Sequence, residues 1–469
     1  MNTNIFIDDI KIQSLISSDN TPDSQQVNDI LNKALELNGL DMSDVATLLN
    51  IEDKDDREML YETAFKIKQE IYGSRLVLFA PLYVSNYCSN NCLYCGFRVD
   101  NKDIPRQALS IDQIKEETLE ILKQGHKRVL LLMGESHKNS PMNYLLESID
   151  AIYGVKDQFG SSIRRINVEI APLTDDEFKQ LNQVPIGTYT VFQETYHKDT
   201  YEIMHPAGPK SDYDFRLNTM DRALSNGMHD VGIGTLFGLY DYKYEVLAMI
   251  SHAEHLDREY GVGPHTISVP RIQPADNAPY SKNIPWAVSD EDFKKIIAIL
   301  RCAVPYTGMI LSTRESENMR RDLYNLGISQ ISAGSKTTIG GYKQALNDKA
   351  DVEQPGQFSL NDCRSSGEII KDVIKQGFIP SFCTSCYRLG RVGGDFMDQA
   401  KPGLIKQFCH PNALMTLKEY LADYADEETQ IMGNNLIDNE IIKIENEKVR
   451  ELTRVNMRNI EMGNRDIYL

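Results

Sequence analysis

Short apolar or β-branched runs alternate with longer amphipathic segments between residues 76 and 335. The apolar runs cover residues 76–85, 128–134, 166–171, 187–194, 230–238, 265–272, 308–314 and 329–335. Segments with helical spacing lie between them at 111–125, 174–183 and 289–303, the last two starting with the capping residues Thr174 and Ser289. Strands alternating with helices predict a buried parallel sheet, and eight strands favour a closed barrel over an open doubly wound sheet.

Both ends of the chain depart from this alternation. Residues 1–75 carry helical spacing over 27–37 and 58–73, whereas the region after residue 340 has a polar stretch, a helical run at 367–377 and long helical stretches. We therefore predict an α/β fold with a complete (β/α)8 TIM-type barrel over 76–340. A helical extension would cover 1–75, and a mainly helical C-terminal domain would cover 341–469 and cap the barrel mouth.

Composition and charge limit the classes of partner. Hydrophobic residues make up 41% of the chain and charged residues 25%, with a net charge of −18. An acidic surface argues against nucleic acid and anionic membranes as partners, although solubility alone would also explain it. We find neither a signal peptide nor an apolar run near the roughly 18 residues of a membrane helix. The expected location is cytoplasmic, where thiols stay reduced.

Six of the eight cysteines form two groups of three, and the first group follows the first predicted strand. Cys88, Cys92 and Cys95 have the spacing C-x3-C-x2-C, at a position where barrels carry catalytic loops. A zinc site would need a fourth ligand, and the nearest downstream candidate is His126. A buried helical stripe is the other alternative, but the intervening Ser-Asn-Asn favours a helix poorly. The spacing favours an iron–sulfur cluster with one open iron that can bind a small molecule.

The second group, Cys383, Cys386 and Cys409, has the spacing C-x2-C-x22-C. Zinc is a stronger alternative here because His410 follows directly, but adjacent ligands point apart unless the backbone bends. The glycine-rich loop between the cysteines would let the chain wrap a bulky cluster, or it is a flexible surface loop. The two remaining cysteines, at positions 302 and 363, are expected to pack.

The first motif resembles that of the radical S-adenosylmethionine superfamily, with Tyr94 at the usual aromatic position. The resemblance implies a 4Fe-4S cluster on the first group whose open iron chelates the amino and carboxylate groups of S-adenosylmethionine. Reductive cleavage then yields methionine and a 5′-deoxyadenosyl radical. The segment LLLMGES resembles the superfamily's Gly-Gly-Glu motif, with Met133 in place of the first glycine. Gly134 and Glu135 would meet the methionine amino group.

Two further segments fit this resemblance. VGIGTLFGL resembles the Gly-x-Ile-x-Gly motif that borders the adenine, which assigns Gly232 and Gly234 to the cofactor site. A strand with close neighbours is the alternative, and the order of elements does not suit a dinucleotide fingerprint. Gln193, Glu194 and Arg216 are expected to contact the ribose and carboxylate of the cofactor, or to be ordinary polar residues.

Both cysteine groups together resemble the tyrosine lyase maturases of FeFe-hydrogenase over nearly the whole chain. The 2-iminoacetate synthase of thiazole biosynthesis shares the barrel but lacks the C-terminal cysteines, and biotin synthase builds its second cluster inside the barrel. The resemblance implies that hydrogen abstraction from the amino group of L-tyrosine breaks the Cα–Cβ bond, giving p-cresol and dehydroglycine. Dehydroglycine would yield carbon monoxide and cyanide at an auxiliary iron–sulfur cluster on Cys383, Cys386 and Cys409, bound to an additional iron for H-cluster assembly.

Three further residues have expected roles. His265, at the start of a predicted strand, would bind the additional iron because imidazole suits iron; a buried hydrogen-bonded histidine is the alternative. Arg314 and Ser332, after the seventh and eighth strands, would bind tyrosine, since an arginine fork matches a carboxylate. Ser335 and Arg271 are alternatives, and at least one of the two arginines is expected in a barrel-end salt bridge.

The expected partners are L-tyrosine, free cysteine, other hydrogenase maturation proteins and an electron donor. Two alternative functions remain. One is another two-cluster radical enzyme, including a 2-iminoacetate synthase-like tyrosine lyase, and the other is a non-catalytic iron–sulfur scaffold.

Overall fold

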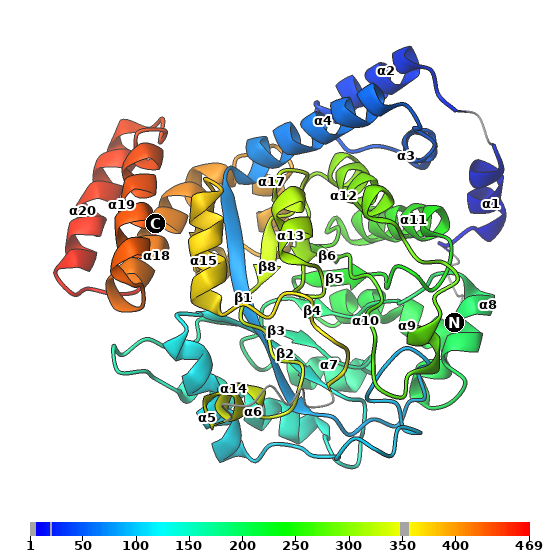
Figure 1. The fold of residues 1–469 in the computed structure, drawn as a ribbon, viewed down its shortest axis with the longest axis horizontal. Coiled ribbons are helices and arrows are strands. Elements are labelled where there is room, and N and C mark those ends of the chain that lie inside the picture. The colour runs from blue at the N-terminus through cyan, green and yellow to red at the C-terminus, as the bar shows by residue number, and fades with distance from the viewer. Residues whose placement is uncertain (1–5, 19–20, 348–355) are drawn as a thin grey trace.

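The computed structural model describes residues 6–18, 21–347 and 356–469. A closed barrel of eight parallel strands lies at its centre (Figure 1). The strands are β1 (Arg75–Ser85), β2 (Arg128–Met133), β3 (Arg165–Glu169), β4 (Tyr189–Thr190), β5 (Val231–Gly234), β6 (Thr266–Ser268), β7 (Gly308–Leu311) and β8 (Gln330–Ser332). Each strand pairs with the next, and β1 pairs with both β2 and β8, so the predicted closed barrel is confirmed.

Helices surround the barrel. Between the strands lie α5 (Ile111–Lys123), α6 (Met142–Gly154), α7 (Asp175–Leu181), α8 (Lys198–Met204), α9 (Tyr213–Leu217), α10 (Thr219–Ser225), α11 (Tyr242–Tyr260), α12 (Asp290–Ala303) and α13 (Glu317–Tyr324), with short 3-10 turns η1 (Pro209–Ser211) and η2 (Pro279–Lys282). The side chains of Thr174 and Ser289 accept hydrogen bonds from the third backbone amides of α7 and α12, as predicted for helix starts.

Four helices precede the barrel and pack against its outer layer. They are α1 (Asp9–Ser17), α2 (Ser24–Ala34), α3 (Met42–Leu49) and α4 (Lys54–Tyr72). Helix α4 packs on α12, while α3 contacts both α11 and α12. Lys295 in α12 donates to the Leu49 carbonyl at 2.9 Å, so the extension is joined to the barrel by polar as well as apolar contacts.

Strand β1 is longer than its neighbours and pairs with two different strands along one of its edges. Its residues Val77–Phe79 pair with β8, while Ala80–Ser85 pair with β2. A ninth strand, β9 (Ile379–Ser381), pairs in parallel with Arg75–Val77. Val77 has partners on both sides, so β9 lies on the edge that β2 uses further along. The sequence did not predict this strand, because three residues are too few to show a period.

The C-terminal region consists of α14 (Gly341–Asn347), α15 (Ser366–Lys375), β9, α16 (Ser385–Arg388), α17 (Gly393–Ala400), α18 (Lys406–Asp423), α19 (Glu427–Ile441) and α20 (Glu447–Glu461). Residues 356–361 lie at the mouth, where the Gly96 amide donates to the Gln357 carbonyl. Beyond α15 the chain reaches the opposite end, since Arg128, the first residue of β2, donates to the Cys383 carbonyl at 2.9 Å. The predicted cap over the mouth is therefore correct only for the first part of this region.

Helices α18–α20 form a layer beside the barrel, away from α1–α3 (Figure 1). Buried apolar side chains run continuously from the barrel wall into α18 and α20, through Leu417 and Ile460. Among the helices in the described residues, none combines the length and apolar character needed to cross a bilayer.

Candidate functional site

The two cysteine groups lie at opposite ends of the barrel. The first follows the C-terminal end of β1 and lines a cavity at the mouth. The second follows β9, whose partner is the N-terminal end of β1. All six thiols are free. Among the described residues, no three His, Cys, Asp or Glu side chains converge on a point that suits a single ion.

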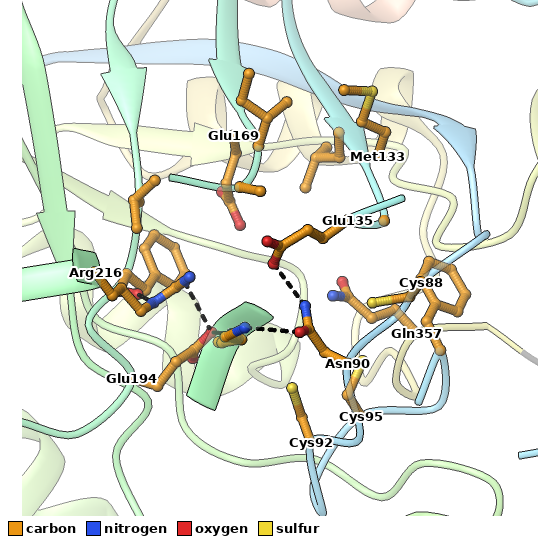
Figure 2. Close-up of a pocket in the computed structure, with 18 of the residues that line it drawn as sticks. Cys88, Asn90, Cys92, Cys95, Met133, Glu135, Glu169, Glu194, Arg216 and Gln357 are labelled. Carbon is orange, nitrogen blue, oxygen red and sulfur yellow. Dashed lines mark hydrogen bonds and ion pairs between the residues drawn. The ribbon is translucent and has the colours of Figure 1, made fainter. Parts of the chain in front are cut away.

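The first cavity is lined by Cys88, Cys92 and Cys95 together with side chains from four strand ends (Figure 2). It contains about 730 Å³ of empty space, part of which is open to solvent. Its other polar lining residues are Asn90, Glu135, Glu169, Glu194, Lys210, Arg216 and Gln357. The cavity therefore combines three thiols with groups of both charges.

Gly134 and Glu135 fix the cysteine loop against the end of β2. The Gly134 amide donates to the Ser85 carbonyl at 2.9 Å, and a Cβ at this glycine would lie 2.4 Å from the Tyr87 carbonyl oxygen. The Glu135 carboxylate accepts from Asn90 Nδ2 at 2.6 Å. Any side chain at position 134 would push the cysteine loop away. This explains why position 134 is glycine, even though Met133 replaces the first glycine of the motif.

Glu194 is the centre of an ion-pair group on the opposite wall. Its carboxylate lies 2.5 Å from Lys210 Nζ and 3.7 Å from an Arg216 guanidinium nitrogen. Burial alone would raise the pKa of Glu194, but these two cations lower it. Glu194 also adopts φ of 72°, a region that non-glycine residues rarely occupy. The surrounding contacts thus hold a charged carboxylate in a strained backbone position.

The other expected cofactor residues lie around this cavity in different ways. Tyr94 lines it and its hydroxyl is 2.8 Å from His205 Nε2. Gln193 is buried behind the lining, and its Nε2 has no hydrogen-bond partner among the described residues. Gly232 and Gly234 do not line the cavity; a Cβ there would collide with Thr266 and Phe192 respectively, so they permit close packing in the wall.

The residues present fit a cluster that leaves one iron for a small ligand. Three thiols face one cavity, whose wall also carries acidic and basic side chains. Gly134 and Gly96 let the cysteine loop pack closely on neighbouring backbone, since a Cβ at each would lie 2.4 Å from the carbonyl oxygens of Tyr87 and Gly356 respectively. Cys88, Cys92 and Cys95 would hold the cluster, and Glu135 with the Glu194 group would meet the polar ends of the cofactor.

Arg106 was not predicted, yet it organises the cysteine loop. Its guanidinium donates to the backbone carbonyls of Asn86, Phe97, Arg98 and Asn101 at 2.5–3.0 Å. Replacing it with Met should leave these carbonyls without their donor, at a cost of about 3 kcal/mol. We expect Arg106→Met to lower iron retention by the first group and to reduce 5′-deoxyadenosine formation at least about tenfold.

The matched control for Arg106→Met is Lys115→Met on the exposed face of α5, where the ammonium group makes only a surface ion pair. Iron content and 5′-deoxyadenosine formation should stay at wild-type values in the control. Wild-type values in Arg106→Met would show that the four carbonyl contacts do not stabilise the loop.

A second cavity adjoins the first, deeper in the barrel, and contains about 600 Å³ of empty space. Apolar side chains dominate its wall, with Arg314, Ser332 and Ser335 among the polar ones. The Arg314 guanidinium stacks on the Phe358 ring at 3.4 Å, and the Ser332 hydroxyl accepts from the Thr313 amide. Arg271, the alternative, is held by Glu315 and Asp290 in the expected salt bridge. Arg314 is therefore the arginine that faces this cavity.

The second cysteine group is built by β9, α16 and α18. Cys383 follows β9, Cys386 lies in α16, and the buried Cys409 lies in α18. The Ser385 amide donates to the Cys383 sulfur at 3.5 Å. His410 points away from this group, because its Nε2 contacts the Glu440 carbonyl in α19 at 3.1 Å. It is not placed to be a fourth ligand to a zinc ion.

Three arginines with buried Nε atoms lie near the second group. Arg75, Arg128 and Arg391 each have an Nε without a hydrogen-bond partner among the described residues. Contact with Cys409 and the charges of Arg391 and Arg75 lower the pKa of the Cys386 thiol. Thiolates are the form that binds iron, and positively charged guanidinium groups with an unpartnered Nε–H suit an anionic cluster. The donor set therefore fits an iron–sulfur cluster on these three cysteines.

His265 directly precedes β6 and lies at the same end of the barrel as the second group. Its Nδ1 is 3.3 Å from Asp230 Oδ1, but the geometry is too poor for a hydrogen bond. The imidazole ring packs against Phe396 of α17, with 4.2 Å between ring centroids. The Gly393 amide at the start of α17 donates to Asp230, which ties the glycine-rich loop to this histidine.

Sequence reasoning missed Lys210, Glu169 and the buried arginines Arg75 and Arg128. Each is isolated in the sequence and reaches its site only through the barrel closure. No local spacing marks them, in contrast to the two cysteine groups.

Comparison with known proteins supports this arrangement. Residues 82–253 match the radical SAM superfamily and residues 268–379 match the biotin and thiamin synthesis associated domain. The 2-iminoacetate synthase of Escherichia coli (strain K12) is 31% identical over 349 residues, covering 74% of this chain and 88% of that protein.

Two solved structures resemble the chain over nearly its whole length. One is the crystal structure of HydG, a maturase of the [FeFe]-hydrogenase, with a TM-score of 0.95, 48% identity and coverage of 99% of this chain and 100% of that chain. The other is the FeFe-hydrogenase maturase HydG from Carboxydothermus hydrogenoformans, with a TM-score of 0.83, 39% identity and coverage of 97% and 100%. The chain belongs to the radical S-adenosylmethionine superfamily and, within it, to the 2-iminoacetate synthase-like family that includes the FeFe-hydrogenase maturases.

Proposed function

We propose that this radical SAM enzyme is a carbon–carbon lyase that cleaves L-tyrosine to p-cresol and dehydroglycine. It then forms carbon monoxide and cyanide on iron for FeFe-hydrogenase H-cluster assembly. One observation carries the proposal: a single barrel holds two groups of three cysteines at opposite ends, with an arginine-bearing cavity beside the first. The first site would cleave the amino acid and the second would process the fragment.

In the first site the protein's own residues would position the substrate and enclose it. When bound, the cluster and S-adenosylmethionine would supply a radical that removes a hydrogen atom from the substrate amino group. Arg314 would hold the substrate carboxylate, with Ser332 or Ser335 as a further hydrogen-bonding group. The apolar wall of the second cavity would hold the phenol ring away from water.

In the second site Cys383, Cys386 and Cys409 would hold the auxiliary cluster, and His265 would bind the additional iron that receives both ligands. The nearby arginines, whose buried Nε atoms lack a partner among the described residues, support an anionic occupant. Free cysteine would complete the product, an electron donor would reduce the first cluster, and other hydrogenase maturation proteins would accept the product. The matches support this site indirectly: the family models end at residue 379, whereas the HydG structures cover the C-terminal region as well.

The deciding experiment supplies anaerobic, reconstituted protein with L-tyrosine, S-adenosylmethionine and dithionite. We expect p-cresol and carbon monoxide together. p-Cresol without carbon monoxide would assign the 2-iminoacetate synthase reaction instead, and an absence of 5′-deoxyadenosine would indicate a non-catalytic scaffold. 5′-Deoxyadenosine without p-cresol would point to another two-cluster radical enzyme with a different substrate.

Arg314 provides a test of substrate binding. Arg314→Lys keeps the charge but loses the planar fork, so the KM for tyrosine should rise about 10- to 100-fold. The formation of 5′-deoxyadenosine without tyrosine should stay unchanged. Arg271→Lys is the matched variant, since that side chain is already engaged by Glu315 and Asp290. A raised KM in Arg271→Lys alone would assign the carboxylate to Arg271.

A further inference from the structure

Glu169 stands where the two cavities meet. It is the last residue of β3 and lines both the first and the second cavity, as do Tyr83, Leu132, Phe192 and Gln357. Among these shared residues Glu169 is the only acid. Figure 2 shows its carboxylate directed into the same space as Glu135 and the three cysteines. A ligand that spans both cavities would pass this carboxylate.

The Glu169 carboxylate differs from those of Glu135 and Glu194 in the first cavity because no protein group binds it. Glu135 accepts from Asn90, and Glu194 is paired with Lys210. No hydrogen bond or ion pair reaches the Glu169 carboxylate from any residue that the structure describes, and Figure 2 draws none. Glu169 is half-buried at the cavity wall, and a carboxylate that faces a cavity without a protein partner is free to bind a polar ligand there.

The groups around Glu169 place its pKa near neutral pH. Burial and the nearby charge of Glu194 raise the pKa of Glu169 to about 7, although the cations Arg314, Lys210 and Arg216 act in the opposite direction. Tyr83, from β1, also faces it and is far too weak an acid to ionise near neutral pH. Glu169 can thus accept a proton near neutral pH and hold it.

The proposed reaction needs a proton acceptor at this place. An amino acid binds from water as the ammonium form, whereas hydrogen-atom abstraction from nitrogen proceeds from a neutral amine. With its carboxylate on Arg314 in the second cavity, a substrate presents its α-nitrogen one carbon away, toward the boundary with the first cavity. Glu169 is the group at that boundary.

We propose that Glu169 accepts a proton from the α-ammonium group of the amino-acid substrate before the hydrogen atom is removed, an inference that rests on the proposed function. One N–H bond breaks heterolytically, its electron pair stays on nitrogen, and the proton bonds to a carboxylate oxygen of Glu169. The products are a neutral amine and a neutral carboxylic acid, and no electron is transferred.

The variant Glu169→Gln keeps the size of the side chain and removes the base. At pH 7 its kcat/KM for p-cresol formation should fall about 100-fold. In the wild type, kcat/KM for tyrosine should fall as the pH drops through about 7, because protonated Glu169 cannot accept a proton. In Glu169→Gln this limb should disappear, and the rate should instead rise with pH as the free amine form of tyrosine becomes available.

Two more variants make the test specific. Glu169→Asp keeps a carboxylate and should retain the limb near pH 7 with partial activity. Glu147→Gln, on the exposed side of α6, is the control for an acid-to-amide change and should match the wild type. Equilibrium binding of S-adenosylmethionine and its tyrosine-independent cleavage should be unchanged in Glu169→Gln, which shows that the fold and the first cluster are intact.

Several outcomes would overturn the proposal. A wild-type rate and pH profile in Glu169→Gln would do so, as would loss of the limb in Glu169→Asp. Weakened S-adenosylmethionine binding in Glu169→Gln with the pH limb retained would assign the carboxylate to the cofactor ribose instead. Failure of the proposed function looks different, because the wild-type protein would then form no p-cresol at any pH.

Discussion

Replacing Cys383 and Cys386 by alanine together is expected to abolish carbon monoxide formation while p-cresol still forms at the wild-type rate. Both cysteines lie at the N-terminal end of the barrel, and neither lines the two cavities at the mouth. Changes at separated sites with no shared partners act independently. Chromatography of p-cresol and gas analysis of carbon monoxide from the same reaction provide the measurement.

The control for this pair is Cys363→Ala. Cys363 is free and exposed, so the expectation that it packs is wrong, whereas Cys302 is buried as expected. Cys363→Ala should leave both products unchanged, whereas the pair should also lose the iron and sulfide that belong to the second cluster. Carbon monoxide at the wild-type level in the double variant would remove the role assigned to the second site. A parallel loss of p-cresol would show that the two ends of the barrel are not independent.

The opposite pattern is expected for Cys92→Ala: 5′-deoxyadenosine, p-cresol and carbon monoxide should all disappear. Cys92 is buried in a small apolar cluster with Tyr94, Met204 and Leu236, so the change removes a ligand from a rigid part of the loop. With two thiols left, the first cluster loses an iron ligand and the cofactor loses its site. Product analysis with iron counting checks the result.

The second cysteine group supplies the internal control for Cys92→Ala. Its cluster should remain, seen as retained iron and a retained spectroscopic signal, because Arg75, Arg128 and Arg391 still surround it. Continued p-cresol formation in Cys92→Ala would contradict the assignment of the first group as the radical-generating site.

The barrel could be predicted because its strands are buried on both faces and read as continuous apolar runs. Even so, β4 keeps only Tyr189–Thr190 in regular pairing, although residues 187–194 form the apolar run. Strand β9 could not be found, because its pairing depends on β1, which lies some 300 residues earlier in the chain. The helices that begin at Thr174 and Ser289 were predicted closely, since their caps are local.

The site could be predicted from the sequence where its chemistry depends on the spacing of residues close together in the chain. The two cysteine groups are such cases, and the structure places each around its own end of the barrel. Glu169 and Arg106 were not predictable, since each depends on what β-strand closure and loop folding bring beside it. Gly232 and Gly234 fit a motif, but in the structure they make room for neighbouring side chains in the wall.

Strand β1 sets the distance between the two cysteine groups. Its last residue leads into the loop that carries Cys88. Its first residues pair with β9, the strand that leads into Cys383. At a rise of about 3.3 Å per residue this strand spans roughly 33 Å, and it pairs with β9, β8 and β2 in turn along its length. Under the proposed function, a two-carbon imine formed in the first site would have to travel the length of the barrel, and the lifetime of that fragment against hydrolysis would become a property on which selection can act.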